Sequence, residues 1–243
     1  MREKVEIVGV GIDKVNMDEA AGMLAEFLEM DICSMVFTPN SEILLDAVKD
    51  REFEDILNSG QLVVPDGIGV VIASRFYGTP MEERVAGYDL MLRLMETADS
   101  QGRSIYLLGG KEGIAEEAAI KLTESYSGLK IVGTRNGYFE SDEEERIIDE
   151  INSRNADILL AALGAPKQER FIYKYKEKLK TKIAMGVGGS LDVLAGRVKR
   201  APVFYQKTGL EWFYRLIKDP KRFMRIMKLP KFIILAFIDA KFR

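Results

Sequence analysis

Short apolar segments alternate with longer amphipathic segments through most of the chain. Seven short segments, rich in β-branched and other apolar residues, are typical of strands. They cover residues 5–10, 34–37, 62–64, 104–109, 129–133, 157–164 and 182–187. Most are apolar almost throughout instead of alternating with polar residues, which is typical of parallel strands buried on both faces.

Helical periodicity fills the intervals between these segments. Helices are expected over residues 17–29, 41–58, 67–77, 87–100, 112–126, 142–154 and 166–179. Strands that alternate with helices indicate a parallel sheet covered by helices on both faces. The pattern therefore predicts an α/β fold, a Rossmann-like three-layer domain with a mostly parallel sheet, over residues 1–195.

The last part of the chain, residues 196–243, is predicted to be a separate helical appendage. Asp219-Pro220 and Leu229-Pro230 are typical of helix starts, because proline is tolerated in the first turn of a helix. Two or three short helices are expected here.

One of these expected helices is amphipathic. Its apolar residues Phe223, Ile226 and Met227 share one face, while Arg222 and Arg225 fall together on another. Such a helix suits a membrane surface. The alternative is a helix that packs on the body of the protein and leaves its charges in solvent.

Charge is divided unevenly along the 243 residues. Residues 203–243 carry ten Lys/Arg and three Asp/Glu, a net charge of +7, so the rest of the chain carries −10 within a total of −3. The same segment holds nine of the 22 aromatic residues. A basic, aromatic tail on an acidic body favours an anionic ligand or surface.

Composition excludes several kinds of chemistry. The chain has no histidine, which excludes histidine-based acid–base catalysis, serine–histidine triads and histidine-ligated metals. Its one cysteine, Cys33, excludes an internal disulfide and a multi-cysteine zinc site, and suits a reducing cytoplasm. The first residues show no secretory pattern, and the apolar run 232–238 is too short to cross a bilayer.

Small and polar residues follow the predicted strands, at the edge where open parallel sheets bind ligands. The first such segment is Gly9-Val10-Gly11, which fits a tight turn or an incomplete dinucleotide fingerprint. The second runs from Thr38 to Glu42; Thr38 and Asn40 suit either helix capping or contact with a ligand.

The third segment, Pro65-Asp66-Gly67, places a carboxylate at this edge after an apolar strand. Asp66 suits either a helix N-cap or, in a chain without histidine, a general base.

Three further segments rich in glycine follow later strands. They are Leu108–Gly113, Leu163–Glu169 and Gly186–Asp192. The first lacks P-loop spacing, so it predicts only a close backbone approach to phosphate. In the second, Pro166 starts a helix, and the Gln168 amide suits recognition of a uracil or a sugar hydroxyl.

These motifs together resemble the WecG/TagA/CpsF family of glycosyltransferases over essentially the whole chain, and the TagA type most. They are TPN-SE (38–42), PDGIGV (65–70), ERVAGYDL (83–90), LLGG (107–110), GAPKQE (164–169), GVGGSLD (186–192) and KRAPVFYQKTGLEWFYRL (199–216). The resemblance implies an inverting enzyme that moves N-acetylmannosamine from UDP-ManNAc to the 4-hydroxyl of N-acetylglucosamine on undecaprenyl diphosphate. It also implies no cofactor, no required metal and a peripheral location on the cytoplasmic face of the bacterial membrane.

The resemblance also implies roles for individual residues. Asp66 becomes the expected catalytic base, and Thr38, Asn40, Arg84 and Gln168 become expected contacts of the nucleotide sugar or the acceptor. The tail arginines, Arg215, Arg222 and Arg225, are expected to reach the donor diphosphate, where arginine forks stabilise the departing UDP without a metal.

Two other classes of function are weighed against a transferase. A nicotinamide-dependent oxidoreductase is disfavoured by the incomplete glycine fingerprint and by Thr38, which stands where an acid would bind the ribose. A nucleic-acid or membrane adaptor without enzymatic activity is disfavoured by the acidic body, and no nucleic-acid partner is expected. The sequence leaves open a UDP-ManNAcA or UDP-hexose donor and the association of the chain into a homo-oligomer.

Overall fold

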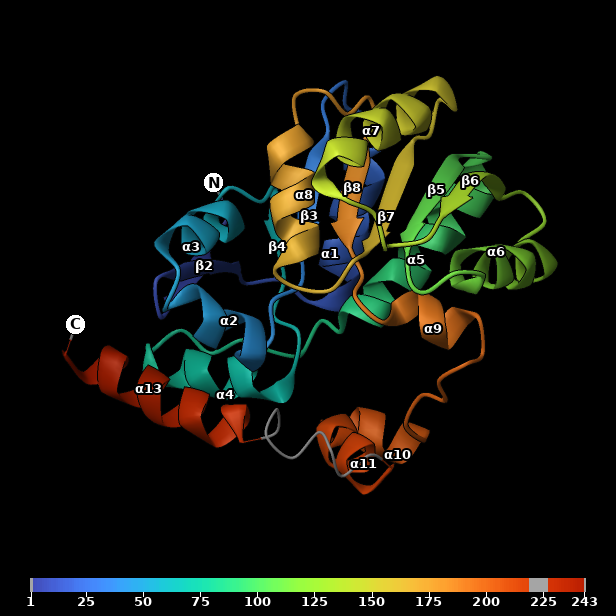
Figure 1. Cartoon of the computed structure of the whole chain (residues 1–243). Coiled ribbons are helices and arrows are strands. Elements are labelled where there is room, and N and C mark those ends of the chain that lie inside the picture. The colour runs from blue at the N-terminus through green and yellow to red at the C-terminus, as the bar shows by residue number, and fades with distance from the viewer. Residues whose placement is uncertain (1, 219–226, 243) are drawn as a thin grey trace.

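The computed structural model describes residues 2–218 and 227–242 and is built around one six-stranded parallel sheet (Figure 1). The strands run in the spatial order β4-β3-β8-β7-β5-β6. Their bounds are β3 Ser34–Phe37, β4 Leu62–Val63, β5 Ser104–Gly109, β6 Lys130–Arg135, β7 Ile158–Ala162 and β8 Ile183–Gly186. Every residue of the central strands β3, β8, β7 and β5 is buried, as expected for a sheet covered on both faces. The predicted three-layer α/β fold is confirmed.

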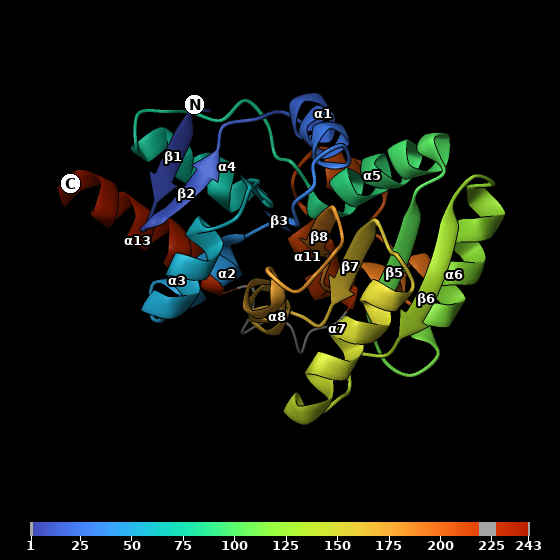
Figure 2. The same cartoon turned by 90° about the horizontal axis from the view of Figure 1, so that it is seen from above.

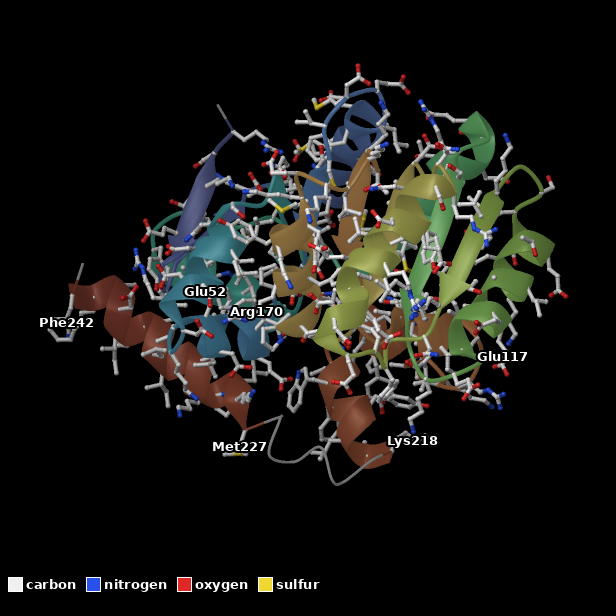
Figure 3. All side chains as sticks on the ribbon, turned by 45° about the horizontal axis from the view of Figure 1, so that its top comes forward. Glu52, Glu117, Arg170, Lys218, Met227 and Phe242 are labelled. Carbon is white, nitrogen blue, oxygen red and sulfur yellow. The ribbon has the colours of Figure 1, made fainter. Side chains whose placement is uncertain are left out.

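Helices cover the two faces of the sheet and enclose two apolar cores (Figure 2). One core includes residues of α2, α3, α4, α7 and α8; the other includes residues of α1, α5, α6 and α9. Their bounds are α1 Met17–Phe27, α2 Ser41–Ala47, α3 Arg51–Asn58, α4 Ile68–Phe76, α5 Gly87–Gln101, α6 Ile114–Ser125, α7 Glu144–Ser153, α8 Lys167–Tyr175 and α9 Ser190–Leu194, with a 3-10 turn η1 at Ser141–Glu143. In Figure 3, Arg170 of α8 lies beside Glu52 of α3, and the two side chains form an ion pair of 2.5 Å.

Two predicted elements differ from the observed ones. Residues 5–10 do not form one strand of the main sheet: β1 (Lys4–Ile7) and β2 (Val10–Asp13) make a separate antiparallel hairpin. Val8 and Gly9 have φ of 46° and 90°, the left-handed pair of a tight two-residue turn. The predicted helix 41–58 is two helices, because the Asp50 side chain caps a new start by accepting from the Phe53 amide at 3.1 Å.

The C-terminal part forms three described helices, α10 (Val203–Lys207), α11 (Glu211–Lys218) and α13 (Lys228–Phe242). Figure 1 shows α10 and α11 below the sheet, on the side where α9 follows β8. Helix α13 begins with Pro230 in its first turn, as predicted, and returns to pack on α2 and α4. Its Phe232 and Ala236 are fully buried in the same core as β3 and α8. The expected helix start at Pro220 lies outside the described residues.

Candidate active site

The order of the strands points to one edge of the sheet as a binding site. β3 is followed by α2 and α3, which contribute to one core, whereas its neighbour β8 is followed by α9, which contributes to the other. Neighbouring strands whose connections leave toward opposite faces open a crevice at their carboxyl ends, where open α/β sheets bind ligands. Thr38 follows β3 and Val187 follows β8, so both lie at this point.

Asp66 lies in the loop between β4 and α4, beside the end of β3. Its amide donates to the Pro39 carbonyl at 3.3 Å, and the Val85 amide donates to the Pro65 carbonyl at 3.1 Å. The N-cap of α4 is Gly67 with a φ of 93°, and this helix start has no side-chain cap. Asp66 therefore precedes the N-cap residue of α4 instead of occupying that position, and its side chain is half-buried at the crevice.

Thr38 and Asn40 lie in the adjoining loop after β3. The Asn40 carboxamide oxygen caps α2 by accepting from the amides of Glu42 at 2.9 Å and Ile43 at 3.2 Å, so its predicted capping role is confirmed. Thr38 packs against the start of α5, since a Cβ added to Gly87 would lie 2.7 Å from the Thr38 Oγ1. The structure therefore brings the segments around Thr38, Asp66 and Arg84 together.

Three helix starts converge with these loops. Helices α2, α4 and α5 begin directly after the segments that carry Asn40, Asp66 and Arg84. The N-cap residues of α4 and α5, Gly67 and Ala86, have no side chain that could accept from the first-turn amides of these helices. Helix N-termini also carry partial positive charge, which favours phosphate groups. The arrangement suits a phosphorylated substrate held beside a carboxylate.

Gln168 lies in the first turn of α8 and is only 4% exposed. Its Oε1 accepts from the Gly164 amide at 3.2 Å and the Gly188 amide at 3.0 Å, and its Nε2 donates to the Glu169 Oε1 at 2.8 Å. The side chain thus joins the loops that follow β7 and β8. These bonds fix the two loops relative to each other, and the contact of Gln168 with a substrate stays a prediction.

Glu169, beside Gln168, is a buried carboxyl for which the sequence suggested only an interaction with the helix dipole. It is 2% exposed, and its Oε2 has no hydrogen-bond partner within the described residues. Burial raises the pKa of Glu169 to about 6, because the charged form loses its hydration. A glutamate in the first turn of a helix usually interacts favourably with the helix dipole. The sequence therefore gives no sign that Glu169 is buried, and only the tertiary structure shows it.

The shifted pKa of Glu169 predicts a pH dependence of stability. A carboxyl whose folded pKa is raised contributes full stability below its unfolded pKa of 4.5, and this contribution is lost as pH rises through about 6. At about 1.4 kcal/mol per pKa unit, the loss is about 2 kcal/mol. Urea unfolding measures the difference in free energy of unfolding between Glu169→Gln and the wild type. We expect this difference to shift in favour of the variant as the pH rises from below 4.5 to above 6. A difference that does not change between these pH values would contradict the raised pKa.

Arg84 lies between the core and the appendage. Its Nη1 lies 2.8 Å from the Glu211 Oε2 at the start of α11, and both side chains are largely buried. Sequence reasoning did not single out Glu211, although it stands in the KRAPVFYQKTGLEWFYRL motif. The expected diphosphate contacts Arg222 and Arg225, and the side chain of Arg215, lie outside the described residues.

Two features of the described part of the chain bear on metals and membranes. Within residues 2–218 and 227–242, histidine, cysteine and carboxylate side chains do not gather into a group that could hold a metal ion. In the same ranges, no helix combines the length and apolar character that a membrane span needs.

Comparison with known proteins identifies the family. The family model described as "Glycosyl transferase WecG/TagA/CpsF family" matches residues 5–243. The N-acetylglucosaminyldiphosphoundecaprenol N-acetyl-beta-D-mannosaminyltransferase of Bacillus subtilis strain 168 is 36% identical over 215 residues, 88% of this chain and 83% of that protein. The protein of the same name from Bacillus spizizenii strain W23 is 36% identical over 207 residues, 85% of this chain and 80% of that protein. The chain, with its carboxylate at the β3–β8 crevice, therefore belongs to the WecG/TagA/CpsF family of glycosyltransferases.

Proposed function

We propose that this enzyme transfers N-acetylmannosamine from UDP-ManNAc to the 4-hydroxyl of N-acetylglucosamine on undecaprenyl diphosphate. The product is the β-1,4-linked disaccharide of the wall teichoic acid linkage unit. The 36% identity to two transferases of this name, across most of both chains, carries the proposal. The half-buried Asp66 beside the starts of α4 and α5 supports it, because the reaction needs a base beside a diphosphate and helix N-termini favour phosphate groups.

The proposed mechanism is a single in-line displacement. The Asp66 carboxylate accepts the proton of the acceptor 4-hydroxyl while that oxygen attacks the anomeric carbon of the donor. The bond to the UDP oxygen breaks on the opposite face, so the configuration inverts. First-turn amides of α4 and α5, together with Arg84 and the tail arginines Arg215, Arg222 and Arg225, stabilise the charge that develops on UDP.

A donor comparison tests this function. UDP-ManNAc, UDP-ManNAcA and a UDP-hexose are each offered with a soluble lipid-diphosphate N-acetylglucosamine analogue, in the presence of EDTA. We expect product mass only with UDP-ManNAc, and no loss from EDTA, because arginines take the place of a metal at the diphosphate. Faster transfer from another donor, or loss with EDTA and rescue by magnesium or manganese, would contradict the corresponding part of the proposal.

We also propose that residues 1–195 form the catalytic core and that the tail holds the enzyme on the cytoplasmic face of the membrane. On α13, Ile234 is 62% exposed and Ile238 is 47% exposed, one turn apart and opposite the buried Phe232. The exposed Lys231 and Lys241 lie on the same side of this helix. Apolar residues between lysines suit an anionic lipid surface, where each cation contributes about 1 kcal/mol. In Figure 3, Met227 lies at the beginning of this helix, on the lower side of the molecule.

The membrane proposal predicts that Ile234→Glu combined with Ile238→Glu weakens sedimentation with vesicles containing anionic lipid. The two introduced carboxylates would lose hydration at the membrane interface, which opposes insertion of this face of α13. Ile120→Glu is the matched control, because Ile120 is 59% exposed but lies on α6, on the opposite side of the molecule from α13 (Figure 1). Equal vesicle binding by the double variant and the control would argue against α13 as the attachment surface.

A further inference from the structure

Four charged side chains join the start of α11 to the core. The Glu211 carboxylate lies between two arginines: its Oε2 is 2.8 Å from the Arg84 Nη1, and its Oε1 is 3.3 Å from the Arg200 Nε. Arg200 in turn donates both terminal nitrogens to Asp89 of α5, at 2.6 and 2.7 Å. We call these four residues, Arg84, Asp89, Arg200 and Glu211, the α11 latch.

Three of the four side chains of the α11 latch are largely shielded from solvent, whereas Asp89 is 38% exposed. The side chains of Glu211, Arg84 and Arg200 are 13%, 15% and 18% exposed, and the Arg200 guanidinium lies 4.7 Å from the centre of the Tyr88 ring. Ion pairs at an exposed surface contribute little, whereas a partly buried carboxylate shared by two arginines restricts the orientation of all three groups. The latch therefore holds the Arg84 fork in one direction and α11 against the core.

We propose that Glu211 is a positioning residue of the transfer reaction. This inference rests on the proposed function and names a residue to which that proposal gives no role. Glu211 acts through two links. It orients Arg84, which is placed in the diphosphate site, and it aligns α11, on which position 215 follows one turn later on the same face.

The chemistry explains why such alignment affects the rate. The departing diphosphate gains negative charge as the bond to the sugar breaks, so its donors must already be oriented when this charge appears. A displacement of about 1 Å in a positioning group can reduce a rate by about 100-fold. The carboxylate at position 211 supplies this orientation without contact with the substrate.

The test is Glu211→Gln in the full-length enzyme, measured as transfer to a soluble acceptor analogue. We expect kcat to fall by about 10-fold or more, with a smaller change in KM for the donor. Hydrogen exchange of the amides in residues 211–218 should become faster. Glu211→Asp, which keeps the charge, should recover part of kcat.

Two comparisons separate positioning from a general loss of stability. In an Arg84→Gln background, Glu211→Gln should lower kcat by a smaller factor than it does in the wild type, because the link from Glu211 to Arg84 is already broken and only the link through Arg200 and α11 remains. Glu117→Gln is the matched control. Glu117 lies on α6 and pairs at the surface with Arg197, which is three residues before Arg200. We expect this variant to transfer at the wild-type rate.

Several results would overturn the inference. Unchanged kcat in Glu211→Gln would remove Glu211 from the reaction, and an equal further loss in the Arg84→Gln background would show that Glu211 does not act through Arg84. Tighter binding of UDP to Glu211→Gln would show instead that this carboxylate competes with the phosphates. Suppose that hydrogen exchange in residues 211–218 is faster in Glu211→Gln, but the wild type itself transfers no sugar. This result would support the α11 latch and contradict the proposed function.

Discussion

Replacing Asp66 by asparagine should leave UDP binding intact and lower transfer by about 100-fold or more. Asparagine has nearly the same shape but cannot accept the proton of the acceptor hydroxyl. The backbone contacts of this loop, from the Asp66 amide to the Pro39 carbonyl and from the Val85 amide to the Pro65 carbonyl, do not depend on the side chain. We therefore expect the variant to fold and to bind UDP in calorimetry with wild-type affinity.

The matched control for this experiment is Asp18→Asn. Asp18 pairs with Arg93 at the surface, with 85% of its side chain exposed, and lies in α1. This substitution should leave both transfer and UDP binding unchanged. Turnover of Asp66→Asn close to that of the control would remove Asp66 from the mechanism.

Replacing Phe232 by alanine should lower the free energy of unfolding by about 3–5 kcal/mol. Phe232 is fully buried and belongs to the core that also contains residues of β3, α4 and α8. Removal of its ring leaves a cavity that the surrounding helices fill only in part. Because small domains are stable by only about 5–15 kcal/mol, this loss is large. Urea unfolding monitored by circular dichroism measures it.

Phe242→Ala is the matched control, since Phe242 lies on the same helix and is 80% exposed. We expect it to change stability by less than about 0.5 kcal/mol. Equal stability of the two variants would mean that α13 does not belong to the core in solution. A chain cut after Pro202 would lose α13 as well, so point variants of the tail test function more cleanly than truncation.

The local pattern of apolar residues was enough for most of the sheet. The segments 34–37 and 104–109 were predicted with the bounds that the structure has, because buried parallel strands are apolar throughout and end at small residues. The same pattern misplaced residues 5–10. An apolar run looks alike in a strand of the main sheet and in a hairpin, and only φ values above zero at Val8 and Gly9 separate the two.

Sequence alone also identified the edge of the sheet and the carboxylate on it. Asp66 and Asn40 both follow apolar strands, and the carboxyl ends of parallel strands must lie at one edge. Whether either side chain serves as a cap could not be decided in this way, since capping depends on the φ and hydrogen bonds of the residue itself. The structure gives that role to Asn40 at α2, whereas the N-cap residue of α4 is Gly67 and not Asp66.

What the chain determined by itself was therefore the class of fold, the family motifs and the absence of histidine chemistry, all of which depend on residue type and local order. The tertiary structure decided the surroundings of each group. It buries Glu169 and joins two loops through hydrogen bonds to the Gln168 side chain. It also brings Glu211 to Arg84, 127 positions earlier in the chain. These surroundings arise from packing between residues far apart in the chain. The free energy of a buried group depends on its loss of hydration and on the groups it contacts, and neither can be inferred from its neighbours in the sequence.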